Sequence, residues 1–194
     1  FSDSIYIIMY KNLYLKKGKE ESLKRFHPWI FSGAVANIDD GVEEGEIVRV
    51  MTSSGDFIAV GMYQIGSIAV RVLSFRDVQI DADFWVARLQ SAWDMRTAIG
   101  LIGRQDNNMF RLVHGEGDNL PGLIIDCYGD TAVMQAHSVG MHLVKNDICE
   151  ALVKVSGGAI SSVYYKSETT LPFKADVDHD NGFIYGSTGS DVAM

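Results

Sequence analysis

The sequence has few cysteines and prolines, and it has no long apolar run. Only two cysteines, Cys127 and Cys149, occur in 194 residues, which is too few for a disulfide scaffold and fits no zinc-binding pattern. The apolar runs are far shorter than the roughly 20 residues that cross a bilayer. No basic region precedes the apolar residues 5–8, as it would in a signal peptide. These absences predict a cytoplasmic protein with no membrane partner.

Short catalytic and metal-binding motifs are also absent. No G-x-G-x-x-G follows an expected strand, and Walker A, G-x-S-x-G and H-E-x-x-H do not occur. Residues 176–182 resemble a calcium loop, but Ser187 stands where a bidentate glutamate is required, which favours a polar hairpin turn. Cys127 has no neighbouring histidine and Cys149 lies in an expected helix, so both are interpreted as inert thiols. We therefore expect no metal site and no catalytic residue in this chain.

The residues that are present can build a core, and they change in pattern along the chain. Hydrophobic residues make up 47% of the sequence, and its length allows one medium domain or two small ones. Residues 46–50 alternate in polarity, residues 53–56 form a turn, and residues 57–63 return as a second strand. With a further strand at residues 67–73, this pattern predicts a small β-barrel.

The remaining part of the sequence has helical and strand patterns in turn. Residues 84–99 predict a helix whose buried face carries Trp85, Leu89, Ala92, Arg96 and Ile99. A second helix is expected over residues 139–155, with Met141, Val144, Ile148, Leu152 and Val155 on its apolar face. Strands are expected at residues 110–113, 123–127, 131–137 and 159–166. This order predicts an α+β fold, with a domain boundary near residues 76–83.

The net charge of −8 hides a local excess of positive charge. Between Met9 and Ser32 the only acidic residues are Glu20 and Glu21, against six cations: Lys11, Lys16, Lys17, Lys19, Lys24 and Arg25. Because polyanions respond to the local field, this segment is compatible with RNA binding. The aromatic residues Trp29 and Phe31 follow it, and they are predicted to fill the core rather than to stack on bases.

A second unusual segment runs from Arg111 to Gly122 and combines an arginine and two carboxylates with glycines and a proline. One interpretation is a rigid cleft wall that positions a substrate. The alternative is an ordinary loop, held in shape by an ion pair from Arg111 to Glu116 or Asp118.

Together these segments resemble the bacterial 23S ribosomal RNA cytosine-5 methyltransferases that begin with a PUA domain, named for pseudouridine synthase and archaeosine transglycosylase. The similarity covers about residues 11–166 and rests on residues 15–20, residues 27–33 and residues 111–126. It continues through Gly45, Val48, Gly55, Gly61, Arg71-Val72-Leu73, Tyr128-Gly129-Asp130 and Gln135. Members of this class I family have a PUA barrel, a small α+β domain and a C-terminal Rossmann-like domain that binds S-adenosylmethionine and carries the nucleophilic cysteine.

The resemblance implies a PUA-like domain at residues 9–78 and a central α+β domain, truncated at its C-terminus, at residues 81–194. The Rossmann-like domain is expected to be absent, so S-adenosylmethionine would serve the full-length enzyme without binding this chain. Neither Cys127 nor Cys149 matches a catalytic position of the family, which leaves open whether this chain alone is an enzyme.

The expected function is therefore the RNA-binding and substrate-framing part of a ribosomal RNA (cytosine-5) methyltransferase, active in rRNA processing. The residues expected to bind ribosomal RNA are Lys16, Lys17, Lys19, Lys24, Arg25 and Arg71. The residues expected to line the cleft are Arg111, Glu116 and Asp118. The alternative is a stand-alone, non-catalytic RNA-binding module of the PUA type, and a homodimer is left open.

Overall fold

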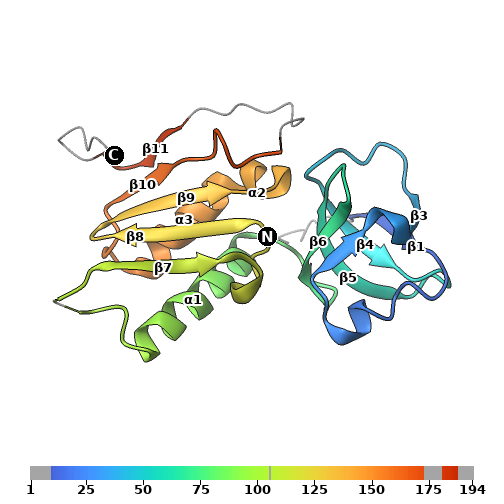
Figure 1. The fold of residues 1–194 in the computed structure, drawn as a ribbon, viewed down its shortest axis with the longest axis horizontal. Coiled ribbons are helices and arrows are strands. Elements are labelled where there is room, and N and C mark those ends of the chain that lie inside the picture. The colour runs from blue at the N-terminus through green and yellow to red at the C-terminus, as the bar shows by residue number, and fades with distance from the viewer. Residues whose placement is uncertain (1–9, 105, 173–180, 188–194) are drawn as a thin grey trace, which may run out of the picture. The chain divides into compact units, whose positions relative to one another are not determined.

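The computed structural model describes residues 10–104, 106–172 and 181–187. The chain divides into two compact units between Asp81 and Ala82. The first unit is a curled sheet, and the second is a flatter sheet with helices on one face (Figure 1).

Six strands form the sheet of the first unit, in the order β2-β6-β5-β4-β1-β3. They are β1 (Lys11–Leu15), β2 (Trp29–Phe31), β3 (Val35–Ile38), β4 (Ile47–Met51), β5 (Phe57–Tyr63) and β6 (Ile68–Ser74). Two single-turn 3-10 helices, η1 (Leu23–Arg25) and η2 (Ser32–Ala34), flank β2. Among the described strands of this sheet, β1 and β4 alone pair in parallel. The sheet curls into a half-barrel, with β2 and β3 as its end strands, so the predicted small barrel takes an open form.

The hairpin of β4 and β5 confirms the strand pattern expected from the sequence. Val48 and Val50 are fully buried in β4, as the alternation of polarity predicts. The turn is closed by the amide of Thr52, which donates to the carbonyl of Asp56 at 2.8 Å. On the next strand, a Cβ at Gly61 would lie 2.4 Å from the carbonyl oxygen of Arg71, so only glycine lets β5 approach β6 at this point.

The prediction that Trp29 and Phe31 fill the core is wrong for Phe31. Strand β2 has only three residues, and its single core side chain is Ile30. Because successive side chains of a strand point to opposite faces, Trp29 and Phe31 turn away from that core. Phe31 is 50% exposed and Trp29 is half-buried.

Five strands form the sheet of the second unit, in the order β11-β10-β9-β8-β7. They are β7 (Met109–His114), β8 (Leu123–Tyr128), β9 (Thr131–Ala136), β10 (Ser162–Tyr165) and β11 (Gly182–Tyr185). A 3-10 helix, η3 (Gly115–Asp118), follows β7. Of the strands that the structure describes in this sheet, β9 and β10 alone pair in parallel, and helices α2 and α3 lie in their connection. Helix α1 (Ala82–Ala98) packs against α3, and both lie behind the sheet in Figure 1.

Two details of the expected helices are wrong. The helix predicted over residues 139–155 is two helices, α2 (Val139–Leu143) and α3 (Lys145–Ser156). They meet at Val144, whose ψ of 13° departs from helical geometry. Ile99, expected on the buried face of the first helix, is 64% exposed, because α1 ends at Ala98 and the chain turns away.

Candidate functional site

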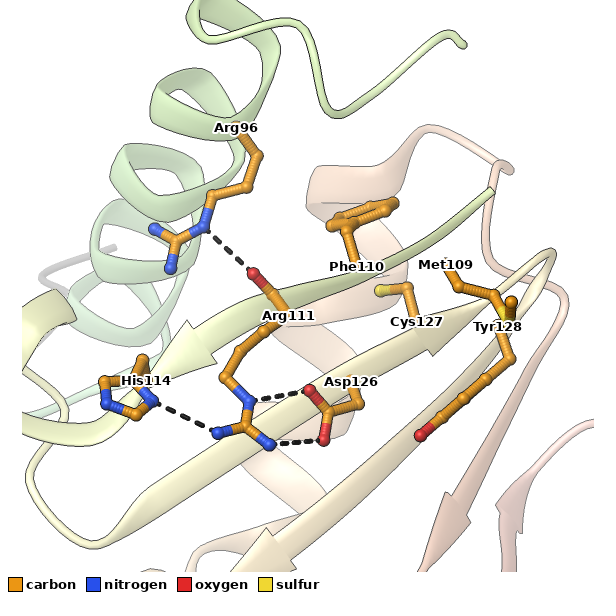
Figure 2. Close-up of a pocket in the computed structure, with 8 residues that line it drawn as sticks. All are labelled: Arg96, Met109, Phe110, Arg111, His114, Asp126, Cys127 and Tyr128. Atoms are coloured by element: carbon orange, nitrogen blue, oxygen red, sulfur yellow. Dashed lines mark hydrogen bonds and ion pairs between the residues drawn. The ribbon is translucent and has the colours of Figure 1, made fainter. Parts of the chain in front are cut away.

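A pocket of about 660 Å³ lies in the second unit, where α1 meets the paired strands β7 and β8. Figure 2 shows the side chains that line it, with Arg111 at the centre between His114 and Asp126. The lining also includes Arg96 from α1 and four residues of β7 and β8: Met109, Phe110, Cys127 and Tyr128. The pocket therefore combines charged groups with exposed apolar and aromatic surface.

Strand pairing brings Arg111 opposite Asp126. The guanidinium donates from Nε to Oδ1 at 2.7 Å and from Nη2 to Oδ2 at 2.9 Å, so the pair is bidentate. Its Nη1 lies 3.2 Å from Nδ1 of His114. The hydrogen bond with Asp126 raises the pKa of Arg111. Asp126 is thus the carboxylate that holds Arg111, rather than Glu116 or Asp118 as the ordinary-loop alternative predicted.

A bulge in β7 places His114 on the same face of the sheet as Arg111. The pairing with β8 shifts by one residue at Leu112, so that Arg111 faces Asp126 while Val113 faces Ile125. Leu112 and Val113 are both fully buried, and the two polar residues on either side of them stay exposed.

Asp118 does not line the pocket. Its carboxylate forms a bidentate ion pair with Arg96, including a 2.8 Å bond from Nη2, and it accepts the amide of His114 at 2.6 Å. Only 10% of the Arg96 side chain and 3% of the Asp118 side chain are exposed. Arg96 Nε also donates to the carbonyl of Arg111 at 3.1 Å. This buried pair connects α1, β7 and η3, and it holds the backbone of Arg111 in place.

Of the three residues expected to line a cleft, only Arg111 lines this pocket. Glu116 lies exposed on η3, and Asp118 is buried. The sequence interpretation missed Arg96 and Asp126 as members of the site. Arg96 could have been found, because an arginine on an otherwise apolar helix face requires a buried partner.

The two cysteines are buried and poorly suited to nucleophilic chemistry. Cys127 is 1% exposed, and burial, together with the charge of Asp126, raises its pKa from 9.0 to about 12. Burial also raises the pKa of Cys149 to about 11. Since the thiolate is the nucleophile, both groups stay in the unreactive thiol form near neutral pH.

We expect both thiols of the folded protein to resist alkylation by iodoacetamide. At pH 8 the thiolate form of Cys127 should be about a thousandfold rarer than at a free thiol. Intact-mass measurement of labelling checks this, with protein unfolded in guanidinium chloride as the control. Native labelling as fast as that of the unfolded chain would contradict the burial of the two thiols.

The raised pKa of Cys127 also makes the stability of the folded protein depend on pH. Because the pKa is higher in the folded state, the stability that this thiol contributes is complete below about pH 9 and decreases as the pH rises toward 12.

The expected RNA-binding residues lie on the first unit. We call residues 16–25 the basic segment; its cations Lys16, Lys17, Lys19, Lys24 and Arg25 are all exposed. Lys16 Nζ donates to the carbonyl of Gly33 at 2.9 Å. Lys24 forms an exposed ion pair with Glu21 at 2.7 Å, and this hydrogen bond lowers the pKa of Glu21. The net charge of the basic segment remains positive when this ion pair is counted.

Arg71, the sixth expected RNA-binding residue, is placed differently. It is half-buried on β6, and its Nη1 donates to Oε1 of Gln64 at 2.6 Å. Its cross-strand partner on β2 is Trp29, so the two side chains leave the same face of the sheet.

The described part of the chain contains no group of histidine, cysteine, aspartate and glutamate side chains able to hold a metal ion. The acidic stretch at residues 176–180, considered above as a calcium loop, lies outside the described residues. Within the described ranges, no helix has both the length and the apolar composition that crossing a bilayer requires.

Comparison with known proteins defines the class of the two units. Residues 13–75 match the family described as PUA-like domain. A solved structure from Streptococcus mutans, named as an S-adenosylmethionine-dependent methyltransferase, superposes with a TM-score of 0.74 at 18% identity over 92% of this chain and 44% of its own. A methyltransferase structure complexed with S-adenosylhomocysteine gives a TM-score of 0.73 at 18% identity, covering 91% of this chain and 43% of its own. The two units therefore share their fold with less than half of each of these solved chains.

The chain is homologous to ribosomal RNA large subunit methyltransferase I. The protein of that name from Aeromonas hydrophila is 36% identical over 188 residues, which are 96% of this chain and 46% of the relative. That of Tolumonas auensis is 37% identical, with the same 96% and 46% coverage. The chain thus spans less than half the length of the curated relatives that it matches. The expected PUA-like domain and the relationship to rRNA methyltransferases are confirmed.

Proposed function

We propose that this chain is the RNA-binding and substrate-positioning part of an S-adenosylmethionine-dependent methyltransferase that modifies C5 of a cytosine in large-subunit ribosomal RNA. The observation that carries the proposal is the exposed basic segment on a PUA-like unit, in a chain homologous to rRNA methyltransferases. In this role the first unit holds the RNA backbone, and the pocket around Arg111 positions the substrate.

The basic segment supplies the affinity for RNA. Five exposed cations stand against two carboxylates within ten residues, and one of those carboxylates is engaged by Lys24. Lysine and arginine side chains that neutralise phosphates release condensed counterions, so the binding should weaken steeply with salt. Such contacts position the protein on RNA without reading its sequence.

The turn from β9 to α2 lacks the features that bind a nucleotide in a Rossmann-like fold. An adenosyl group is bound where a strand leads through a glycine-rich turn into a helix. The turn from β9 to α2 instead carries His137 and Ser138, and the Ser138 hydroxyl accepts the amide of Met141 as a helix cap. We therefore propose that S-adenosylmethionine binds to the remainder of a full-length enzyme.

Arg111 is the residue we assign to positioning the substrate. A guanidinium has five N–H donors, and Asp126 and His114 engage three of them. The bidentate pair with Asp126 fixes the plane of the group, so its remaining donors are directed without further loss of side-chain entropy. They can hold a phosphate or base oxygen of the RNA beside the apolar surface of Met109 and Tyr128.

In the complete enzyme, Arg111→Ala should lower methyl transfer to ribosomal RNA by about 10- to 100-fold, because misplacement of a substrate by about an ångström has effects of this size. RNA affinity should change little, since the five cations of the basic segment, on the other unit, supply most of that affinity. Incorporation of labelled methyl groups and the dissociation constant are measured together. Arg104→Ala removes an exposed arginine outside the pocket and serves as the control. Wild-type turnover in Arg111→Ala would show that residues 111–122 are an ordinary loop with no role in positioning the substrate.

The mass of the native protein in its own cells distinguishes this proposal from the stand-alone module. A methyltransferase should have a mass well above the 21.4 kDa of this chain, by about the length of one further domain. A native mass near 21.4 kDa would favour RNA binding without catalysis.

A further inference from the structure

A second pocket lies on the first unit, beside the basic segment. Its volume is about 330 Å³, at the low end of the range for sites that enclose small organic groups. Its lining comes from the chain around η1, from β2 and from η2, and it includes Lys19, Leu23, Trp29, Phe31 and Gly33. The sequence did not indicate a site here, because it predicted that Trp29 and Phe31 fill the core.

The aromatic rings of this pocket form a corner. The ring centroids of Trp29 and Phe31 are 6.4 Å apart, and the ring planes are perpendicular at 90°. The ring of His27 lies 6.0 Å from that of Trp29 and 6.2 Å from that of Phe31. Half of the surface of Phe31 is exposed to solvent, although an exposed phenylalanine forgoes the favourable free energy of burying its ring. A flat ring entering the pocket can stack on one wall and contact the edge of the other.

Positive charge surrounds this aromatic corner. Lys19 lines the pocket, and Lys16 is held at its rim by the bond from Nζ to the carbonyl of Gly33. Across the described ranges, Lys17 and Lys19 take part in no ion pair, so their charges are available to an anion. Aromatic platforms beside cations are the combination that proteins use to bind single-stranded nucleic acid.

We propose that this pocket binds one unpaired base of single-stranded RNA, stacked on Phe31 and Trp29, with the flanking phosphates on Lys16, Lys17 and Lys19. This inference rests on the proposed RNA-binding function and specifies the form of RNA that the first unit selects. Bases of a duplex are stacked on one another and cannot enter a pocket, whereas bases in loops and bulges can be splayed out. The first unit therefore prefers single-stranded RNA to a duplex.

Variants of Phe31 test the pocket in the 194-residue chain. The probes are a short fluorescein-labelled single-stranded RNA of mixed sequence and a duplex of the same sequence, followed by fluorescence anisotropy. Phe31→Leu keeps an apolar side chain but removes the π-face, and it should weaken single-strand binding by about 5- to 150-fold. Phe31→Tyr keeps the ring and should bind like the wild type. Phe183→Leu, at an exposed phenylalanine of the second unit, is the matched control.

The two proposals fail in different ways in this experiment. Duplex affinity and the salt dependence should be unchanged in Phe31→Leu, because the phosphate contacts remain. Equal single-strand affinity in Phe31→Leu and the wild type would overturn the base pocket and leave the basic segment intact. Equal losses for single strand and duplex would also overturn it, since Phe31 would then only support the phosphate-binding surface. A wild-type chain that binds neither probe would overturn the proposed RNA-binding function itself.

Discussion

Simultaneous replacement of Lys16, Lys17 and Arg25 by glutamate should abolish binding of ribosomal RNA. The three side chains are exposed on one short segment, and reversal replaces three phosphate contacts by three repulsions. We expect an affinity loss of about 100-fold or more at physiological salt. The slope of log affinity against log salt should also fall by about 2 to 3, because each lost contact removes nearly one released counterion.

A variant with the same change in net charge separates local from global electrostatics. Arg104, Lys154 and Lys166 are exposed cations of the second unit, and their joint replacement by glutamate changes the net charge by the same amount. If RNA responds to the local field, this variant should retain most of its affinity. Equal losses in the two triple variants, or wild-type affinity in the first, would remove the basic segment from the RNA interface. Fluorescence anisotropy over a salt series measures both quantities.

Asp118→Ala should destabilise the second unit by about 3–5 kcal/mol, because it leaves the Arg96 guanidinium buried without its counter-charge. The backbone amide of His114 loses its acceptor in the same variant. Urea unfolding followed by tryptophan fluorescence measures the effect well, since Trp85 and Trp93 both lie in α1, the helix that carries Arg96.

Two further variants show whether the unpaired charge is the cause. Arg96→Met combined with Asp118→Leu removes both charges and keeps apolar volume, and it should recover much of the lost stability. Asp106→Ala breaks an exposed ion pair of the same unit and should unfold with the wild type. A double variant as unstable as Asp118→Ala would show that geometry at η3, rather than charge burial, determines the stability.

Local patterns in the sequence predicted most of the elements, because they depend on neighbouring residues. Alternation and a glycine-containing turn indicated β4 and β5, and helical spacing indicated α1. The break at Val144 was missed because the apolar spacing continues across it while the backbone does not. The spacing of apolar residues reports which side chains are buried, and a change in ψ at a single residue leaves that spacing intact.

The contacts of the site were harder to predict, because they join residues far apart in the chain. Arg96 meets Asp118 across 22 residues, and Arg111 meets Asp126 across 15. A loop with one arginine and two carboxylates suggests pairing within itself, whereas strand register decided the partner of Arg111. The exposure of Phe31 was missed for a related reason: β2 is too short for alternation to show which face is inside.

The bulge at Leu112 makes the length of β7 as important as its composition. The additional residue lets Leu112 and Val113 both enter the core while Arg111 and His114 remain outside. If the same residues formed a strand without the bulge, Arg111 and His114, which are three positions apart, would point to opposite faces of the sheet. A graft of this site onto another sheet must therefore copy the bulge together with the residues, because a regular strand of the same sequence would separate Arg111 from His114.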